Sequence, residues 1–232
     1  MLDSEIPSLV VFDLDDTLYE YEKPNIVASE AIVKIIASRT ELSGSEVKQA
    51  LQDARTRVKE RLGDTASSHS RLLYISEVFR LLRVRPDPIF FIQVEEIFWS
   101  RFLDEITINP GAKDLIHKFE SLRIPIALVT DLTSQIQYRK LEKLGLSNSF
   151  DIIITSEDSA GDKSTRKPYK LLLNSLDKKP KNVWFIGDGI HDSDSTLIGQ
   201  GLFFKKGSAV NLVDIERSIT YNCLTDILKF LK

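Results

Sequence analysis

The chain contains two short apolar runs, far apart in the sequence, that each end abruptly in acidic residues. Residues 10–12 lead into Asp13, and residues 182–187 lead into Asp188. Short runs of β-branched and aromatic residues bounded by polar residues are typical of buried strands in a parallel sheet. The pattern therefore predicts two buried strands, each with carboxylates directly after its last residue.

Between these two runs the pattern changes, and apolar residues recur three and four positions apart, as in amphipathic helices. Ser43 and Glu46 have the spacing of a capping box, and Asp87 followed by Pro88 is typical of a helix start. The predicted helices cover residues 25–39, 43–62, 68–84 and 88–104. Four amphipathic helices in succession predict a small helical bundle inserted after the first strand.

From residue 109 onward, helical and strand-like segments alternate. The predicted helices are 112–122, 133–144, 168–177 and 225–231, the predicted strands are 125–130, 150–155, 182–187, 202–205 and 219–222, and 156–166 is a polar loop. This alternation predicts an α/β protein with a doubly wound parallel sheet. The predicted organisation is an α/β core of residues 1–17 and 108–232 with an all-α cap at 18–107.

Composition adds little to this organisation but limits the function classes. The 232 residues are 42% hydrophobic and 28% charged, and the net charge is -3. These values are ordinary for a soluble globular protein and give no sign of a nucleic-acid or membrane partner. A single cysteine, Cys223, and an amino-terminal stretch without the basic residues of a secretory signal favour a cytoplasmic location. Monomer and homodimer are both left open.

The acidic residues after the two strands are the strongest chemical signal. Ligands of open α/β sheets bind at the carboxyl ends of the strands, so Asp13, Asp15, Asp188 and Asp192 are expected in one cleft. Because so many carboxylates repel one another, they stay ionised together only around a cation. A set of oxygen ligands suits a hard divalent ion, Mg²⁺ above all.

Four motifs occur in a fixed order along the chain. They are Asp13-Leu14-Asp15-Asp16-Thr17, the strand IALVT ending at Thr130, Lys167-Pro168, and the acidic pair in GDGIHD at 187–192. In this order the chain resembles the haloacid dehalogenase superfamily, in the branch with a helical cap between the first two motifs. DxDxT alone would be a weak signal, whereas four motifs at the expected strands and helices are specific.

The resemblance implies a magnesium-dependent phosphohydrolase of a small phosphorylated metabolite, built on a Rossmann-like core. In this family Asp13 would be the nucleophile that becomes phosphorylated. Asp15 would protonate the leaving oxygen and then activate water, while its backbone carbonyl binds the metal. Asp13, Asp188 and Asp192 would supply the other metal ligands. The presence of Asp15 argues against a dehalogenase.

The resemblance also implies how the phosphoryl group is held. Thr130 and the backbone N–H of Asp131 would bind its oxygens, and Lys167 would offset their charge. Lys163, which lies closer to Gly161, is the alternative lysine. The proline and apolar run after Lys167 favour Lys167.

Substrate choice is expected to reside in the cap, where a basic and polar group of residues could face the cleft. Its members are Arg57, His69, Arg71 and Tyr74. A solvated helix face is an equally good interpretation of this group. Two other functions remain open. One is a phosphomutase on the same scaffold, and the other, ranked lower because all catalytic positions are filled, is a non-catalytic phosphate-binding module.

Overall fold

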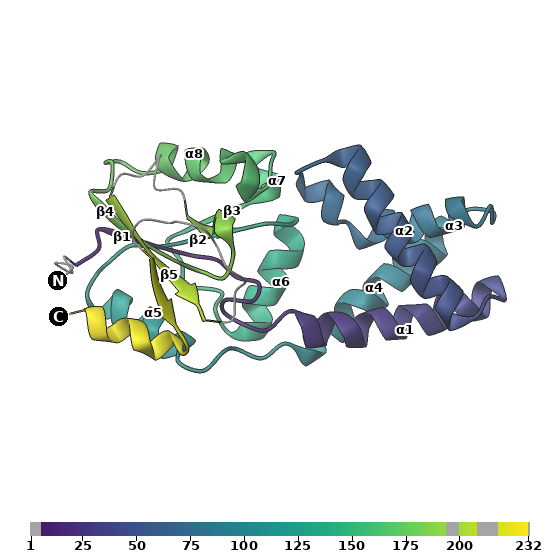
Figure 1. Ribbon diagram of the computed structural model, residues 1–232, viewed down its shortest axis with the longest axis horizontal. Coiled ribbons are helices and arrows are strands. Elements are labelled where there is room, and N and C mark those ends of the chain that lie inside the picture. The colour runs from purple at the N-terminus through teal and green to yellow at the C-terminus, as the bar shows by residue number, and fades with distance from the viewer. Residues whose placement is uncertain (1–5, 194–199, 208–217, 232) are drawn as a thin grey trace. The chain divides into compact units, whose positions relative to one another are not determined.

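The chain divides into two compact units that alternate along the sequence. A computed structural model describes residues 6–193, 200–207 and 218–231 (Figure 1). One unit comprises Met1–Glu20 with Thr107–Lys232, and the other is Tyr21–Ile106. The boundaries of the cap predicted from the sequence lie after residue 17 and before residue 108.

The first unit is built on a six-stranded sheet with the order β3-β2-β1-β4-β5-β6, in which every pair of neighbours is parallel. The strands are β1 Leu9–Phe12, β2 Ile126–Thr130, β3 Ile152–Thr155, β4 Asn182–Gly187, β5 Gln200–Lys206 and β6 Ser218–Tyr221. The predicted α/β fold with a parallel sheet is confirmed.

Strand β1 lies inside the sheet, between β2 and β4, and all four of its residues are buried. Phe12 pairs with Leu128 of β2 on one side and with Ile186 of β4 on the other. Parallel strands end at the same edge of a sheet. The register therefore brings the residues that follow β1, β2 and β4 to one edge.

Helices cover both faces of this sheet, as a doubly wound fold requires (Figure 1). Tyr169 and Leu172 of α8 pack on the face formed by Val11, Val129 and Phe185. On the other face, Phe119 of α5 and Phe230 of η4 contact strand aromatics. The helices of this unit are α5 Ala112–Ser121, α6 Ser134–Leu144, α7 Ser156–Ser159 and α8 Lys167–Asn174, and the 3₁₀ turns are η2 Lys163–Thr165, η3 Ile190–Asp192 and η4 Leu224–Phe230.

Two segments of this unit differ from their predictions. Residues 156–166, predicted as a polar loop, contain α7 and η2, because Thr155 and Asp158 form a capping box that starts a helical turn. The last segment, predicted as a helix over 225–231, is the 3₁₀ helix η4. At its start the Asp226 carboxylate accepts a hydrogen bond from the Cys223 N–H.

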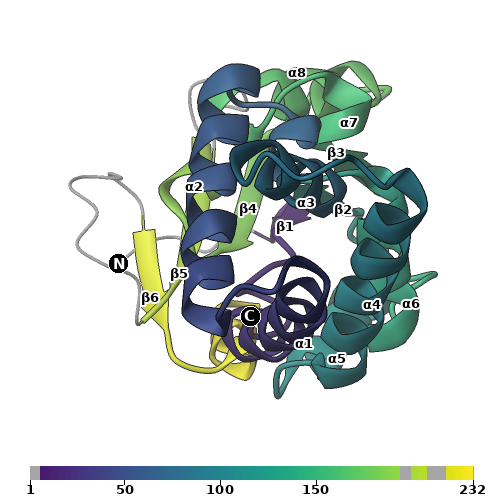
Figure 2. The ribbon, with the colours of Figure 1, turned by 90° about the vertical axis from the view of Figure 1, so that its right-hand side faces the viewer.

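The second unit is all helical, and its members are α1 Glu22–Thr40, α2 Gly44–Leu62, the 3₁₀ turn η1 Ala66–His69, α3 Arg71–Leu81 and α4 Pro88–Glu105. Helix α1 packs along α4, and α2 along α3 (Figure 2). Tyr74, Phe79, Phe91, Phe98, Trp99 and Phe102 are among its buried residues. None of the helices in the described part of the chain combines the length and the apolar character that crossing a membrane requires.

Helix boundaries in this unit follow their caps. Ser43 and Glu46 form the predicted capping box, and the Asp87 side chain accepts a hydrogen bond from the Phe90 N–H. Helix α3 begins at Arg71 rather than at the predicted residue 68, because the Ser70 hydroxyl accepts from the Leu73 N–H and η1 is a separate turn.

Candidate active site

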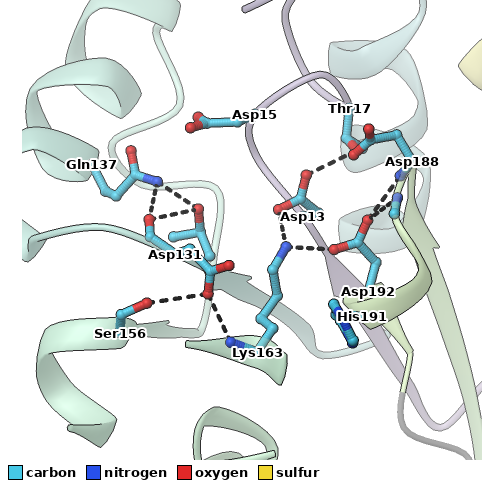
Figure 3. Close-up of polar contacts among 12 residues, drawn as sticks. Asp13, Asp15, Thr17, Asp131, Gln137, Ser156, Lys163, Asp188, His191 and Asp192 are labelled. Carbon is cyan, nitrogen blue, oxygen red and sulfur yellow. Dashed lines mark hydrogen bonds and ion pairs between the residues drawn. The ribbon is translucent and has the colours of Figure 1, made fainter. Parts of the chain in front are cut away.

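Asp13, the residue directly after β1, lies at the centre of the site (Figure 3). It is 5% exposed, and its N–H donates to the carbonyl of Ile186 in β4, 2.9 Å away. Its Oδ1 accepts from Lys163 Nζ at 2.6 Å and its Oδ2 accepts from Thr17 Oγ1 at 3.0 Å. A cation on one side and a hydroxyl on the other therefore fix this carboxylate.

Two further carboxylates lie beside Asp13. One carboxylate oxygen from each of Asp13, Asp188 and Asp192 lies within 4.8 Å of the others. Asp192 Oδ2 accepts from the N–H groups of Asp188 and Gly189, so the turn after β4 folds Asp192 back toward Asp188 (Figure 3). A Cβ at Gly187 would overlap the Asp192 side chain, which is why this position requires glycine.

Burial and mutual repulsion dominate the electrostatics of this cluster. Burial, followed by the charges of Asp192 and Asp16, raises the pKa of Asp188 to about 6. Burial also holds the pKa of Asp13 well above its usual range, although the Lys163 charge opposes this. Burial alone would lower the pKa of Lys163, but its attraction to Asp13 and Asp192 raises it. Negative charge therefore exceeds the positive charge that Lys163 supplies.

The cluster fits the predicted metal. Asp13, Asp188 and Asp192 offer only oxygen atoms, which hard divalent cations such as Mg²⁺ prefer. A cation among these side chains would also offset the repulsion and the burial that raise their pKa values. The three residues predicted to bind the metal through their carboxylates are thus brought together.

The side chain of Asp15, the fourth predicted metal-binding residue, whose backbone carbonyl is the expected ligand, points away from Asp13 (Figure 3). Lys140 Nζ of α6 donates to both of its carboxylate oxygens, at 2.8 Å each, and Tyr19 OH donates to Oδ1 at 2.7 Å. Lys140 and Tyr19 have no exposed surface. Sequence analysis missed Lys140, although its position four residues from Ile136 and from Leu144 places it on the apolar stripe of the predicted helix.

The segment after β2 forms a second group of polar contacts. Asp131 Oδ1 accepts from the Lys163 N–H at 2.8 Å and from Ser156 Oγ at 3.1 Å (Figure 3). Burial raises the pKa of this carboxyl, and Lys163 opposes the shift. Gln137 of α6 donates to Thr130 Oγ1 and to the Asp131 carbonyl. Gln137 is a second buried polar residue that sequence analysis did not select.

The structure places Lys163, rather than the preferred Lys167, beside Asp13. Lys163 Nζ donates to Asp13 and Asp192 and is buried, whereas Lys167 is exposed and its Nζ donates to the Ala160 carbonyl at 2.8 Å. The reason is local geometry. Arg166 has a φ of 62°, and this left-handed residue separates the turn η2 from α8, which Lys167 begins.

Three of the four residues predicted for substrate choice lie together in the helical unit. Arg71 Nη1 donates to the His69 carbonyl at 3.0 Å. The Arg71 guanidinium carbon lies 4.9–5.5 Å from the ring centroids of Tyr74, Phe98 and Trp99. Arg57 is exposed on α2. At such distances the guanidinium is attracted electrostatically to the faces of the rings.

Comparison with known proteins agrees with the four motifs. A family model described as a haloacid dehalogenase-like hydrolase matches residues 7–195. A ribulose-1,5-bisphosphate 5-phosphatase from Halopiger xanaduensis is 31% identical over 182 residues, which cover 78% of this chain and 76% of that protein. A glyceraldehyde 3-phosphate phosphatase from Methanocaldococcus jannaschii is 22% identical over 228 residues, covering 96% of each chain.

A similar fold occurs among solved structures. The crystal structure of a HAD phosphatase from Thermococcus onnurineus has a TM-score of 0.70 to this chain, at 16% identity. The match covers 96% of this chain and 97% of that one. At this identity the comparison supports the fold.

Proposed function

We propose that this chain, which belongs to the haloacid dehalogenase-like hydrolase family, is a magnesium-dependent phosphohydrolase. Its substrates in this proposal are small phosphorylated metabolites. One observation carries the proposal. Asp13 is a buried carboxylate at a strand end, bonded to a buried lysine and next to two more carboxylates. This combination suits a nucleophile that receives a phosphoryl group.

In the first step, an Asp13 carboxylate oxygen attacks phosphorus, and the bond from phosphorus to the ester oxygen breaks. Lys163 and the Thr130 hydroxyl offset the charge on the phosphoryl oxygens. Asp15 gives a proton to the departing oxygen, and for this its side chain has to leave Lys140 and turn toward Asp13 (Figure 3). The products of this step are the free alcohol and an aspartyl-phosphate.

In the second step, water attacks the phosphorus of the aspartyl-phosphate. Asp15 takes a proton from that water, the bond from phosphorus to Asp13 breaks, and inorganic phosphate leaves. Both residues are then in their starting states. Magnesium held by Asp13, Asp188 and Asp192, when bound, supplies positive charge that orients the phosphoryl group.

Lys163 is the phosphate-binding lysine of this proposal. Its contact with Asp13 supports this role, whereas Lys167 bonds a carbonyl of its own loop. The exclusion of water and the choice of substrate are assigned to the helical unit Tyr21–Ile106, which begins eight residues after Asp13 in the sequence.

The nucleophile is tested by Asp13→Asn, which keeps the size of the side chain but removes its nucleophilic oxygen. Phosphate release is measured from ribulose 1,5-bisphosphate, glyceraldehyde 3-phosphate and p-nitrophenyl phosphate. We expect a loss of at least about a thousandfold in kcat. Asp114→Asn, the same change at an exposed site on α5, serves as the control. Unchanged hydrolysis by the Asp13 variant would remove the nucleophile assignment.

The same substrates separate the proposal from its alternatives. A phosphomutase would convert a sugar phosphate to an isomer and release little phosphate. A phosphate-binding module would bind phosphate without turning over any ester. Either result would replace the hydrolase proposal.

A further inference from the structure

Gln137 in the first turns of α6 is a polar side chain with no exposed surface. Its Nε2 lies 2.6 Å from the carbonyl oxygen of Asp131 and 2.5 Å from Thr130 Oγ1 (Figure 3). A carbonyl oxygen only accepts hydrogen bonds, so the amide must present its NH₂ group to it. The contact with Asp131 therefore fixes which way round the amide of Gln137 lies.

The direction of the Thr130 hydroxyl follows from this orientation. The second N–H of Gln137 donates to Thr130 Oγ1, which makes that oxygen the acceptor and leaves its own hydrogen to point elsewhere. Among the contacts of the described residues, that hydrogen has one acceptor, the Asp131 carbonyl at 3.5 Å. This distance is far longer than a normal O–H···O bond. The hydroxyl is thus kept as a donor for another oxygen.

The same amide also supports an unusual backbone. Leu132 has a φ of 92°, which is a strained conformation for a leucine. The Asp131 carbonyl that Gln137 bonds belongs to the peptide leading into Leu132. The Gln137 Oε1 has no partner among the residues that the structure describes. The amide therefore makes two donated bonds, while its own acceptor oxygen is unpaired among the described residues.

We propose that Gln137 is a positioning residue. It holds the strained turn at Thr130–Leu132 and presents the Thr130 hydroxyl as a donor to the phosphoryl group. This inference rests on the proposed phosphohydrolase function, in which Thr130 binds a phosphoryl oxygen.

Gln137→Glu tests the inference because it exchanges NH₂ for an acceptor of nearly the same shape. Thr130 then donates to the new carboxylate rather than to the phosphoryl group. We expect kcat/KM for p-nitrophenyl phosphate to fall by about ten- to a hundredfold, as when an oxyanion donor is lost. The control is Gln135→Glu, the same change on the exposed side of α6, with less than about a twofold effect.

A double-mutant cycle shows whether Gln137 acts through Thr130. Without the hydroxyl, in Thr130→Val, the change Gln137→Glu has no donor to redirect. We expect it to slow the Thr130→Val enzyme far less than the wild type. A general loss of structure would slow both backgrounds equally. Equal losses in the two backgrounds, or wild-type kcat/KM in the single variant, would overturn the inference.

A buried glutamate could prevent folding, which thermal unfolding would reveal. In that case Gln137→Met removes the donor without adding charge, and the same cycle is run with it. For Gln137→Met we expect kcat/KM to fall by less than about tenfold, and the inference is supported if this loss disappears in the Thr130→Val background. An equal loss of kcat/KM in both backgrounds overturns it. A wild-type enzyme without phosphatase activity refutes the proposed function and this inference with it, whereas an active wild type with additive variants refutes the inference alone.

Discussion

The electrostatics of the site depend on a few buried charged side chains. Lys163 contacts Asp13 and Asp192 and is buried with them, so its charge offsets theirs in a medium of low polarity. Lys167, four residues along the chain, lies in solvent. Replacing Lys163 is therefore expected to affect activity and stability far more than replacing Lys167.

Lys163→Met is expected to lower kcat at least about a hundredfold, because the phosphoryl charge and Asp13 lose their cation. It should also destabilise the magnesium-free protein by about 3–5 kcal/mol, since two carboxylates are left buried without their partner. Lys167→Met should change stability by less than about 0.5 kcal/mol. Phosphate release and urea unfolding of the two variants measure both effects. Equal losses of activity would contradict the assignment of Lys163.

The ends of the strands could be predicted from the sequence, whereas the lysine beside Asp13 and the buried polar residues of α6 could not. The run before Asp13 could be recognised as a buried strand, and strand ends predict where carboxylates gather. The lysine could not be chosen in this way, because its position depends on the left-handed residue Arg166, which has no sequence signature. Gln137 and Lys140 face inward on a helix whose polar residues are otherwise expected in solvent.

The start of α2 offers a test of an element end in the helical unit. Hydrogen bonds from the Ser43 side chain and then from its N–H lower the pKa of the Glu46 carboxyl. A carboxyl whose pKa is lowered by folding stabilises the protein above its unfolded-state pKa. This stabilisation is lost as the pH falls through its folded-state value.

Glu46→Gln should therefore destabilise the protein at neutral pH, and the difference from wild type should vanish in acid. Urea unfolding of both proteins, at neutral pH and again in acid below the pKa of the Glu46 carboxyl, measures this difference in the free energy of unfolding. Ser43→Ala, which removes the cap itself, should cost about 1 kcal/mol at neutral pH. A Glu46→Gln penalty that is the same at both pH values would contradict the charge-based explanation.

On the scale of the whole molecule, the site joins segments from opposite ends of the chain. Asp13 follows β1, and Asp188 and Asp192 follow β4, with the entire helical unit between them in sequence. A ligand shared by these residues binds only when both segments are folded together. Binding of the ligand therefore contributes to the stability of the fold.

Magnesium is accordingly expected to raise the midpoint of thermal unfolding. At a hundredfold excess over its Kd the gain is about 2.7 kcal/mol, or several degrees for a chain of this size. EDTA should reverse the shift and abolish turnover. Asp188→Asn should lose most of the shift, whereas Asp114→Asn should keep it. A shift of equal size in the two variants would contradict a site at Asp13, Asp188 and Asp192.

The central position of β1 has a consequence for how the protein is made. β1 is synthesised before the other five strands of the described sheet, yet its two neighbours begin only at Ile126 and Asn182. While the ribosome translates the intervening codons, Leu9–Phe12 have no strand to pair with, and the helical unit with its short-range contacts is free to fold. The catalytic centre is thus completed only after Asp188 and Asp192 have been synthesised, long after Asp13, and a product terminated before residue 163 carries Asp13 without Lys163 or Asp188.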